Sequence, residues 1–242
     1  MGKAVNNPMT VVKKSANVRY ERKFVYQNSN ADDIIQRVYL NSFGFKEVFH
    51  KRKINNIYFD DSNYNFYKQN VEGVANRKKL RLRWYGQTTS QIENPTIEVK
   101  KKIGEAGDKD SFPLKMAALD LNKLSAADVY TFLVNNTAQY AALNQTLKVL
   151  LPTLLNTYER RYFLSFCGRY RITVDFNQEF YNPNYSYYGN SGVSINDIVL
   201  ELKYAVKDDN DARQLSQQID ARLSKNSKYV KGIDLLYHPV QM

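Results

Sequence analysis

The chain of 242 residues carries 35 lysines and arginines against 24 aspartates and glutamates, which gives a formal charge of +11. This excess favours an anionic partner such as nucleic acid, an acidic membrane surface or a phosphorylated small molecule. One cysteine and two histidines exclude an intrachain disulfide and a Cys/His zinc site. No apolar run approaches the ~18 residues of a membrane span, so we expect no transmembrane segment and a cytoplasmic protein.

Residues 1–18 lack periodicity and are predicted to form a flexible N-terminal arm, followed by a single domain over 19–238. From Arg19 onward, apolar and charged residues alternate with the period of two that is typical of strands. The first strand is predicted over 19–26 and the second over 54–60. A helix over 31–41 lies between them, with Asn30 as its N-cap.

The middle of the chain begins with the most regular alternation, KLRLRWY over 79–85, which predicts a strand that ends at a glycine. A further strand is expected over 96–102. Two helical stretches follow at 125–135 and 138–150, and Pro152 opposes continuation of the second helix.

The C-terminal third again alternates between strands and helices. Strands are predicted over 157–166, 170–176 and 198–204, with a tyrosine-rich candidate over 180–188, and helices over 209–223 and 227–237. Seven or eight strands with helices between them predict an α+β fold, in which a closed antiparallel β-barrel carries its helices on the outside.

The function depends on which face of these strands points inward. An ordinary sheet would turn its charged face to water and its apolar face to the core. However, the amphipathic helices need an apolar surface to cover, and an outward apolar face that includes Leu82, Val99 and Leu202 would provide it. We therefore expect the charged faces to line the inside of the barrel.

The charged residues recur in a fixed unit. Glu-x-Lys occurs at Glu21/Lys23, Glu98/Lys100 and Glu201/Lys203, and alternate residues of a strand share a face. The predicted lining also contains Arg19, Arg81, Arg83, Arg171 and Asp175. So many buried like charges require water and an anion, and a linear polyanion fits best. Arginine forks and lysines suit phosphate oxygens, and the carboxylates suit a divalent metal held against phosphate. Alternatively, each carboxylate pairs with a neighbouring lysine.

An ordered series of motifs resembles the VTC domains, the polyphosphate-polymerase branch of the CYTH/triphosphate-tunnel superfamily. The motifs are Arg19-x-Glu21-x-Lys23, NIYFD, KLRLRWYG, IEVKKK, YERRY, YRITVDF, LELK and SKYVKG. The resemblance covers residues 18–238 and implies an eight-stranded triphosphate tunnel. It also implies transfer of the γ-phosphate of ATP onto polyphosphate with Mn²⁺ or Mg²⁺; ATP, polyphosphate, tripolyphosphate and pyrophosphate are the implied partners.

The resemblance also implies roles for single residues. The implied phosphate contacts are Lys23, Arg81, Arg83, Lys100, Lys109, Arg160, Arg171, Lys225 and Lys228, and the implied metal ligand is Glu201. Neighbouring residues of a strand point to opposite faces, and the sequence YERRY allows either Arg160 or Arg161 to be the one that faces inward. Many tunnel hydrolases have an acid where Arg19 stands here, which favours a polymerase with one metal.

Three other functions remain open from the sequence. The same fold could serve a tripolyphosphate or nucleoside-triphosphate hydrolase, or a polyphosphate-binding domain without catalysis. A nucleic-acid-binding barrel is the fourth interpretation. It is disfavoured because Phe24 and Trp84 alternate out of phase with the basic residues.

Overall fold

The computed structural model describes residues 19–89, 91–103, 106–114, 118–122, 125–183 and 192–237. The predicted N-terminal arm lies outside these residues, as does most of the tyrosine-rich candidate strand. In chain order the elements are β1 (Arg19–Tyr26), α1 (Ala31–Leu40), β2 (Lys46–Asp60), α2 (Asn65–Glu72), β3 (Asn76–Tyr85), β4 (Gln91–Glu93), β5 (Thr96–Ile103), β6 (Ala106–Pro113), β7 (Ala118–Asp120), α3 (Ala126–Asn136), α4 (Ala141–Leu147), β8 (Leu151–Leu164), β9 (Arg171–Tyr181), β10 (Val193–Ile195), β11 (Ile198–Ala205), a 3₁₀ turn (Val206–Asp208), α5 (Asp209–Gln217) and α6 (Lys228–Tyr237).

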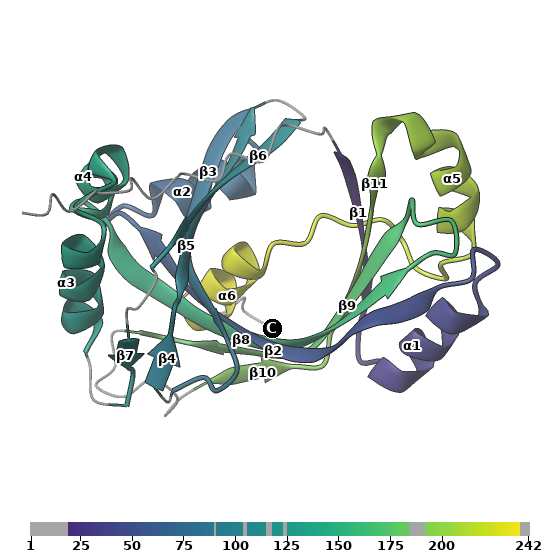
Figure 1. The fold of residues 1–242 in the computed structure, drawn as a ribbon, viewed down its shortest axis with the longest axis horizontal. Helices are drawn as coiled ribbons and strands as arrows, with labels where there is room; N and C mark the ends of the chain where they lie inside the picture. The colour runs from purple at the N-terminus through teal and green to yellow at the C-terminus, as the bar shows by residue number, and fades with distance from the viewer. Residues whose placement is uncertain are drawn as a thin grey trace, which may run out of the picture.

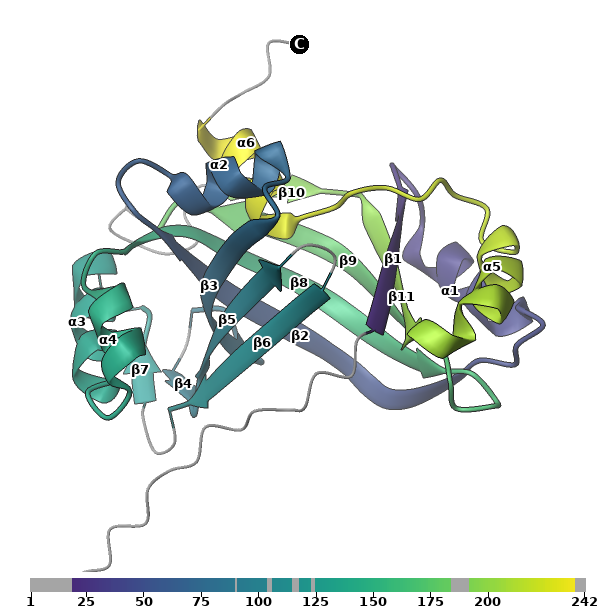
Figure 2. The ribbon, with the colours of Figure 1, turned by 90° about the horizontal axis from the view of Figure 1, so that it is seen from above.

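One antiparallel sheet dominates the fold, with the strand order β1-β11-β9-β8-β2-β3-β5-β6 and β10 added beside β9. The sheet curls strongly, and β1 and β6 face each other across its open side (Figures 1 and 2). Among the described residues no ladder joins these two edge strands. The α+β class with a large antiparallel sheet is therefore confirmed, whereas the predicted closure of the sheet into a barrel is not observed.

The convex side of the sheet carries two apolar cores. In one, Ile34, Val38 and Leu215 of α1 and α5 pack on a sheet surface that includes Leu200 and Leu202. The other joins α3 and α4 to β2, β3 and β5, with Leu82 and Ile97 fully buried. These helices lie outside the curl of the sheet (Figure 1). At these two cores the apolar strand faces thus point outward, as the need of the amphipathic helices for an apolar surface predicted.

The helix α6 is the exception, because it packs on the concave side. Its Tyr229 and Ile233 form a small core with Tyr58, Leu154 and Phe180, and the rings of Tyr58 and Tyr229 stack with centroids 5.0 Å apart. The helix is visible through the opening of the curled sheet in Figure 1. It covers the end of the concave side where β2 ends and β8 begins.

The buried carboxylate of Asp60 fixes this end of the molecule. It accepts hydrogen bonds from the backbone amides of Phe66 (2.9 Å) and Tyr67 (2.8 Å) in α2, and from the Tyr229 hydroxyl (2.5 Å) in α6. One side chain at the end of β2 therefore anchors two helices. Such charge-assisted hydrogen bonds are among the stronger ones in proteins.

The structure corrects several predicted boundaries. Strand β6 was not predicted, because its sequence AGDKDSFP is rich in residues that disfavour strands. Strand β8 begins at Leu151, with Pro152 at a shift in register, where the sequence predicted the end of a helix. Helix α5 ends at Gln217 rather than at residue 223. No helix among the described residues is long and apolar enough to cross a membrane.

We predict that Gly232→Ala destabilises the protein, although alanine ordinarily favours a helix over glycine by about 1 kcal/mol. A Cβ atom at Gly232 would lie 2.5 Å from Leu154 Cδ2 and 2.7 Å from Phe180 Cδ1, and both side chains are fully buried. Overpacking of this kind costs about 1–3 kcal/mol. The free energy of unfolding in urea measures the effect. The control is Gly107→Ala, where a Cβ meets no atom within 4 Å. A stabilised Gly232→Ala protein would contradict the packing of α6.

Candidate functional site

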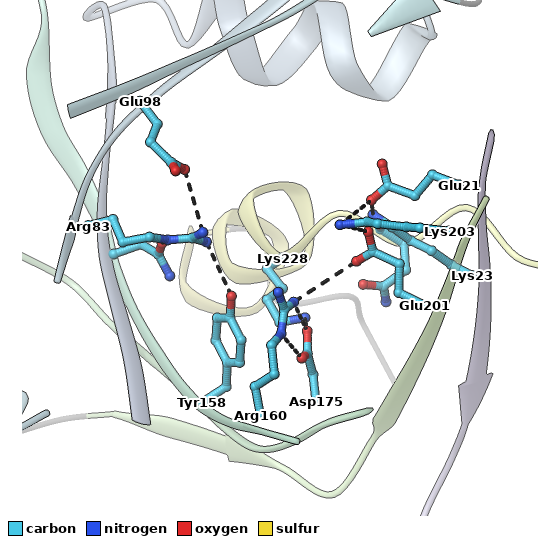
Figure 3. Close-up of polar contacts among 12 residues, drawn as sticks. Glu21, Lys23, Arg83, Glu98, Tyr158, Arg160, Asp175, Glu201, Lys203 and Lys228 are labelled. Carbon is cyan, nitrogen blue, oxygen red and sulfur yellow. Dashed lines mark hydrogen bonds and ion pairs between the residues drawn. The ribbon is translucent and has the colours of Figure 1, made fainter. Parts of the chain in front are cut away.

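The concave face of the main sheet carries most of the predicted charged residues. Arg83 and Glu98 extend from one wall, Arg160 and Asp175 from the floor, and Glu21, Lys23, Glu201 and Lys203 from the opposite wall (Figure 3). Lys228, at the start of α6, reaches the floor between them. The walls are β3/β5/β6 and β1/β11, and the floor is β8/β9. Residues that are distant in sequence thus converge on one concave face.

On the first wall, Glu98 holds several cations. Arg81 donates from Nε (2.9 Å) and Nη2 (2.6 Å) to Glu98 Oε2, and Lys109 Nζ donates to Oε1 (2.8 Å). Arg83 Nη1 lies 3.5 Å from Oε2. Burial would raise the pKa of Glu98, but the charges of Arg81, Arg83 and Lys109 outweigh it and hold that pKa well below its ordinary value. Glu98 is therefore ionised and partly neutralises this wall.

The same wall contains a row of lysines. Lys79, Lys100 and Lys109 lie directly opposite one another in the ladders of β3, β5 and β6. Like charges in this arrangement repel. Burial together with the charges of Lys23 and Arg81 lowers the pKa of Lys79 to about 7, and burial beside Arg81 lowers the pKa of Lys100 well below its usual range. The row thus has the electrostatic character of an anion site.

The floor centres on a fully buried carboxylate. Asp175 accepts from Arg160 Nε (2.5 Å) and Nη2 (2.7 Å) and from Lys228 Nζ (2.6 Å). Burial would raise the pKa of Asp175, but Arg160 and Lys228 lower it below the ordinary value. These contacts decide the parity of YERRY: Arg160 faces inward. Arg161 faces the other side of the strand and donates to Glu47 Oε1 (2.8 Å).

The opposite wall joins two of the Glu-x-Lys units. In the antiparallel ladder of β1 and β11, Glu21 faces Lys203 and Lys23 faces Glu201. Lys203 Nζ lies 2.7 Å from Glu201 Oε1 and 4.0 Å from Glu21. Burial would raise the pKa of Glu201. A hydrogen bond with the Glu21 side chain and the positive charges of Lys203 and Lys23 outweigh burial and lower this pKa well below its usual range. Glu201 is thus an ionised carboxylate on the concave face.

The carboxylates on this wall fit a divalent cation that phosphate helps to bind. Glu201 Oε1 is buried and accepts no well-aligned hydrogen bond within the described chain, despite the nearby Lys203 ammonium. No group of three His, Cys, Asp or Glu side chains among the described residues could hold a metal alone. Mg²⁺ is commonly held by one or two carboxylates plus substrate phosphates. Glu201 with Glu21 could supply that share of the ligands.

Three predicted site residues lie apart from this network. Arg19 shares a face of β1 with Lys23, and Arg171 shares a face of β9 with Asp175. Both arginines lie toward the ends of their strands and are exposed. Lys225 is also exposed, in the segment before α6. None of the three forms an ion pair within the described part of the chain. The second Lys of the C-terminal pair, Lys228, lies inside the network instead.

The sequence reasoning missed the aromatic part of the concave face. Tyr158 is buried, its hydroxyl lies 3.3 Å from Arg83 Nη2, and Lys228 Nζ lies 4.5 Å from its ring centroid. Burial would raise the pKa of Tyr158, but the charges of Arg160 and Arg83 lower it. Tyr58 accepts from Arg81 Nη1 (3.2 Å). The signal was present, because Tyr158 stands two residues before Arg160 and shares its face.

The chain was compared with solved structures, with curated proteins and with models of protein families. Solved structures of similar shape include a candidate adenylate cyclase of Vibrio parahaemolyticus (14% identity, TM-score 0.47, covering 88% of this chain and 97% of that one). A Pyrococcus horikoshii protein is also similar (14%, TM-score 0.48, 89% and 98%), as is a conserved hypothetical protein of Pyrococcus furiosus (10%, 0.47, 89% and 99%). Comparison with curated proteins finds no match. The family model described as the VTC domain matches residues 18–237. The chain therefore belongs to the VTC domain family.

Proposed function

We propose that this protein is a metal-dependent polyphosphate polymerase that transfers the γ-phosphate of ATP onto a polyphosphate chain along its concave face. The observation that carries the proposal is the lysine row, Lys79, Lys100 and Lys109, in register on a wall that also holds Arg81 and Arg83. A sheet that served packing alone would not place these cations in direct register. A polyphosphate chain would compensate their charge at regular intervals.

The arginines and lysines would act by position and charge. Arg83 and Arg160 face the same space from a wall and the floor, and guanidinium groups match phosphate oxygens through paired hydrogen bonds. Phosphoryl transfer needs aligned donor and acceptor phosphates and stabilisation of the charge on the transferred group. Fixed cations in a partly desolvated site provide both.

Glu201, with Glu21 on the neighbouring strand, would hold Mn²⁺ or Mg²⁺. The ion, when bound, would neutralise charge on the phosphate oxygens. Glu98 and Asp175 have a different role in the proposal. Each already binds cations of the wall or the floor, so they keep the arginines ionised and oriented when phosphate is absent.

The closed eight-stranded tunnel is part of the proposal for the ligand-bound protein. A polyanion between the two walls would attract the cations of both, including Lys23 on β1 and Lys109 on β6. That attraction would favour approach of the two edge strands around the phosphate chain.

Product analysis tests the proposal directly. Incubation with ATP and Mn²⁺ should yield ADP and long-chain polyphosphate on a gel. Release of orthophosphate alone would instead support a hydrolase of the same fold.

Glu201→Gln should abolish turnover and remove the effect of Mn²⁺ on tripolyphosphate affinity. Salt-sensitive binding without turnover, unchanged in Glu201→Gln, would indicate a polyphosphate-binding domain.

Arg83→Gln should reduce turnover about a hundredfold or more, which is the usual cost of removing one donor that stabilises transition-state charge. The protein should stay folded, because Glu98 keeps Arg81 and Lys109 as partners. Arg161→Gln is the matched control. It also removes a guanidinium group, but from the face of β8 that points away from the concave side, where Arg161 donates to Glu47. Steady-state rates with ATP measure the effect. Equal losses in both variants would contradict the assignment of the concave face.

Binding of tripolyphosphate should take up protons at pH 8. The pKa of Lys79 is lowered to about 7, so its amine is mostly neutral at that pH, and a bound anion raises the pKa again. Affinity should therefore fall as the pH rises above 7. Calorimetry in buffers of different ionisation enthalpy measures the protons. Uptake should be smaller in Lys79→Arg, because arginine stays protonated. Uptake that is absent in the wild type would contradict the role of Lys79.

A further inference from the structure

Three aromatic rings surround the guanidinium group of Arg52. Its Cζ atom lies 5.1 Å from the ring centroid of Phe49, 5.6 Å from that of Tyr85 and 5.5 Å from that of Tyr162. Phe49 and Tyr162 also meet edge to face, with centroids 5.8 Å apart. We refer to these four residues as the aromatic cluster. Its side chains come from β2, β3 and β8, which are neighbours in the sheet.

The aromatic cluster continues the phosphate-binding surface. Arg52 lies directly opposite Arg160 in the ladder of β2 and β8, and the Arg160 guanidinium lies 6.0 Å from the Tyr162 ring centroid. Tyr162 thus contacts an arginine of the floor and the arginine of the cluster. Tyr85 shares a face with Arg83, two residues and about 7 Å along β3. The cluster lies at the end of the concave face away from α6.

Two of the rings are unusually accessible. Phe49 is 54% exposed and Tyr85 is 55% exposed, and neither belongs to an apolar core formed by the described residues. Arg52 and Tyr162 are half-buried; Arg52 contacts both exposed rings and Tyr162 contacts that of Phe49. Cation–π contacts alone would not require such exposure, because they are stronger when water is excluded. The cluster therefore offers open π-faces and a cation beside the arginines.

We propose that the aromatic cluster binds the base of the nucleoside triphosphate substrate by stacking. This inference rests on the proposed function, since it requires the triphosphate to lie along Arg83 and Arg160. A nucleotide has its base at one end of its phosphates. The cluster lies two residues, or about 7 Å, along the strands beyond those arginines. Aromatic rings and arginine both stack on bases, whose flat π-faces suit them.

The competing explanation is that the rings only support Arg52, and through it the floor of the site. The two explanations differ for a ligand without a base. Stacking predicts a loss for ATP alone, because tripolyphosphate has the phosphates but offers nothing to the rings. A supporting role predicts equal losses for both ligands.

The test compares ATP and tripolyphosphate, each with Mg²⁺, by calorimetric titration of the full chain. In Phe49→Ala/Tyr85→Ala the dissociation constant for ATP should rise about tenfold or more, since stacking contributes about 1–3 kcal/mol per base. The constant for tripolyphosphate should stay the same. Phe166→Ala is the matched control, because Phe166 is an 87% exposed aromatic beyond the end of β8, where its backbone amide donates to Phe43 O in the segment after α1. Phe49→Leu/Tyr85→Leu keeps apolar bulk without the rings if the alanine variant does not fold.

Unchanged ATP affinity in the leucine and alanine variants would overturn the inference and leave the phosphate site intact. Equal losses for ATP and tripolyphosphate would also overturn it and assign the rings a supporting role. If the wild type binds neither ligand, the proposed function itself fails. The two failures are therefore distinguishable.

Discussion

Repulsion among the cations of the concave face is the constraint on which the rest of the structure depends. Lys79, Lys100 and Lys109 stand in register, and their wall faces Lys23 and Lys203 across the sheet opening. Beyond the end that α6 covers, such a face cannot be covered by an apolar helix, because the charged groups would lose their hydration. The apolar faces of the same strands must then bear the core, and α1, α3, α4 and α5 pack on the convex side. The position of the cations thus decides the position of the helices.

The carboxylates reduce the repulsion among these cations but do not neutralise the whole concave face. Glu98 and Asp175 each bind cations on the wall or the floor, while Glu201 lies between Lys23 and Lys203. Removing one partner from a buried pair costs about 3–5 kcal/mol, so these acids contribute to the stability of the fold. The cations still outnumber the acids, and the concave face keeps a net positive charge.

Much of this arrangement was predictable from the sequence, because alternation fixes which residues share a face. The inward direction of Arg81, Lys100 and Glu201 and the outward direction of Leu82 and Leu202 followed from that rule together with the need to cover amphipathic helices. The parity of Arg160 did not follow, since YERRY reads equally well in both registers, and the ladder to Asp175 decides it.

Other features depend on tertiary contacts that no local pattern encodes. Strand β6 forms because β5 offers it an edge, despite glycine, aspartate and proline in its own sequence. The assembly of Phe49, Tyr85 and Tyr162 around Arg52 needs three strands and the irregular register of β2 near Phe49. The position of α6 inside the curl, rather than on the convex side, likewise depends on the fit of Gly232 against Leu154 and Phe180.

The two edge strands have a consequence for the behaviour of the protein in solution. Within the described chain, β6 pairs only with β5, and the outer edge of β1 is covered only near its end, by an isolated bridge of Phe24 to Leu223 and a hydrogen bond from Ser224 N to Lys23 O (2.9 Å). The rest of each edge presents unpaired backbone groups that could recruit a strand from another molecule. Both strands are dense in charge: RYERKFVY in β1 and AGDKDSFP in β6. Charged edge residues discourage intermolecular sheet extension. The charged side chains of the two edge strands therefore also oppose association of one molecule with another.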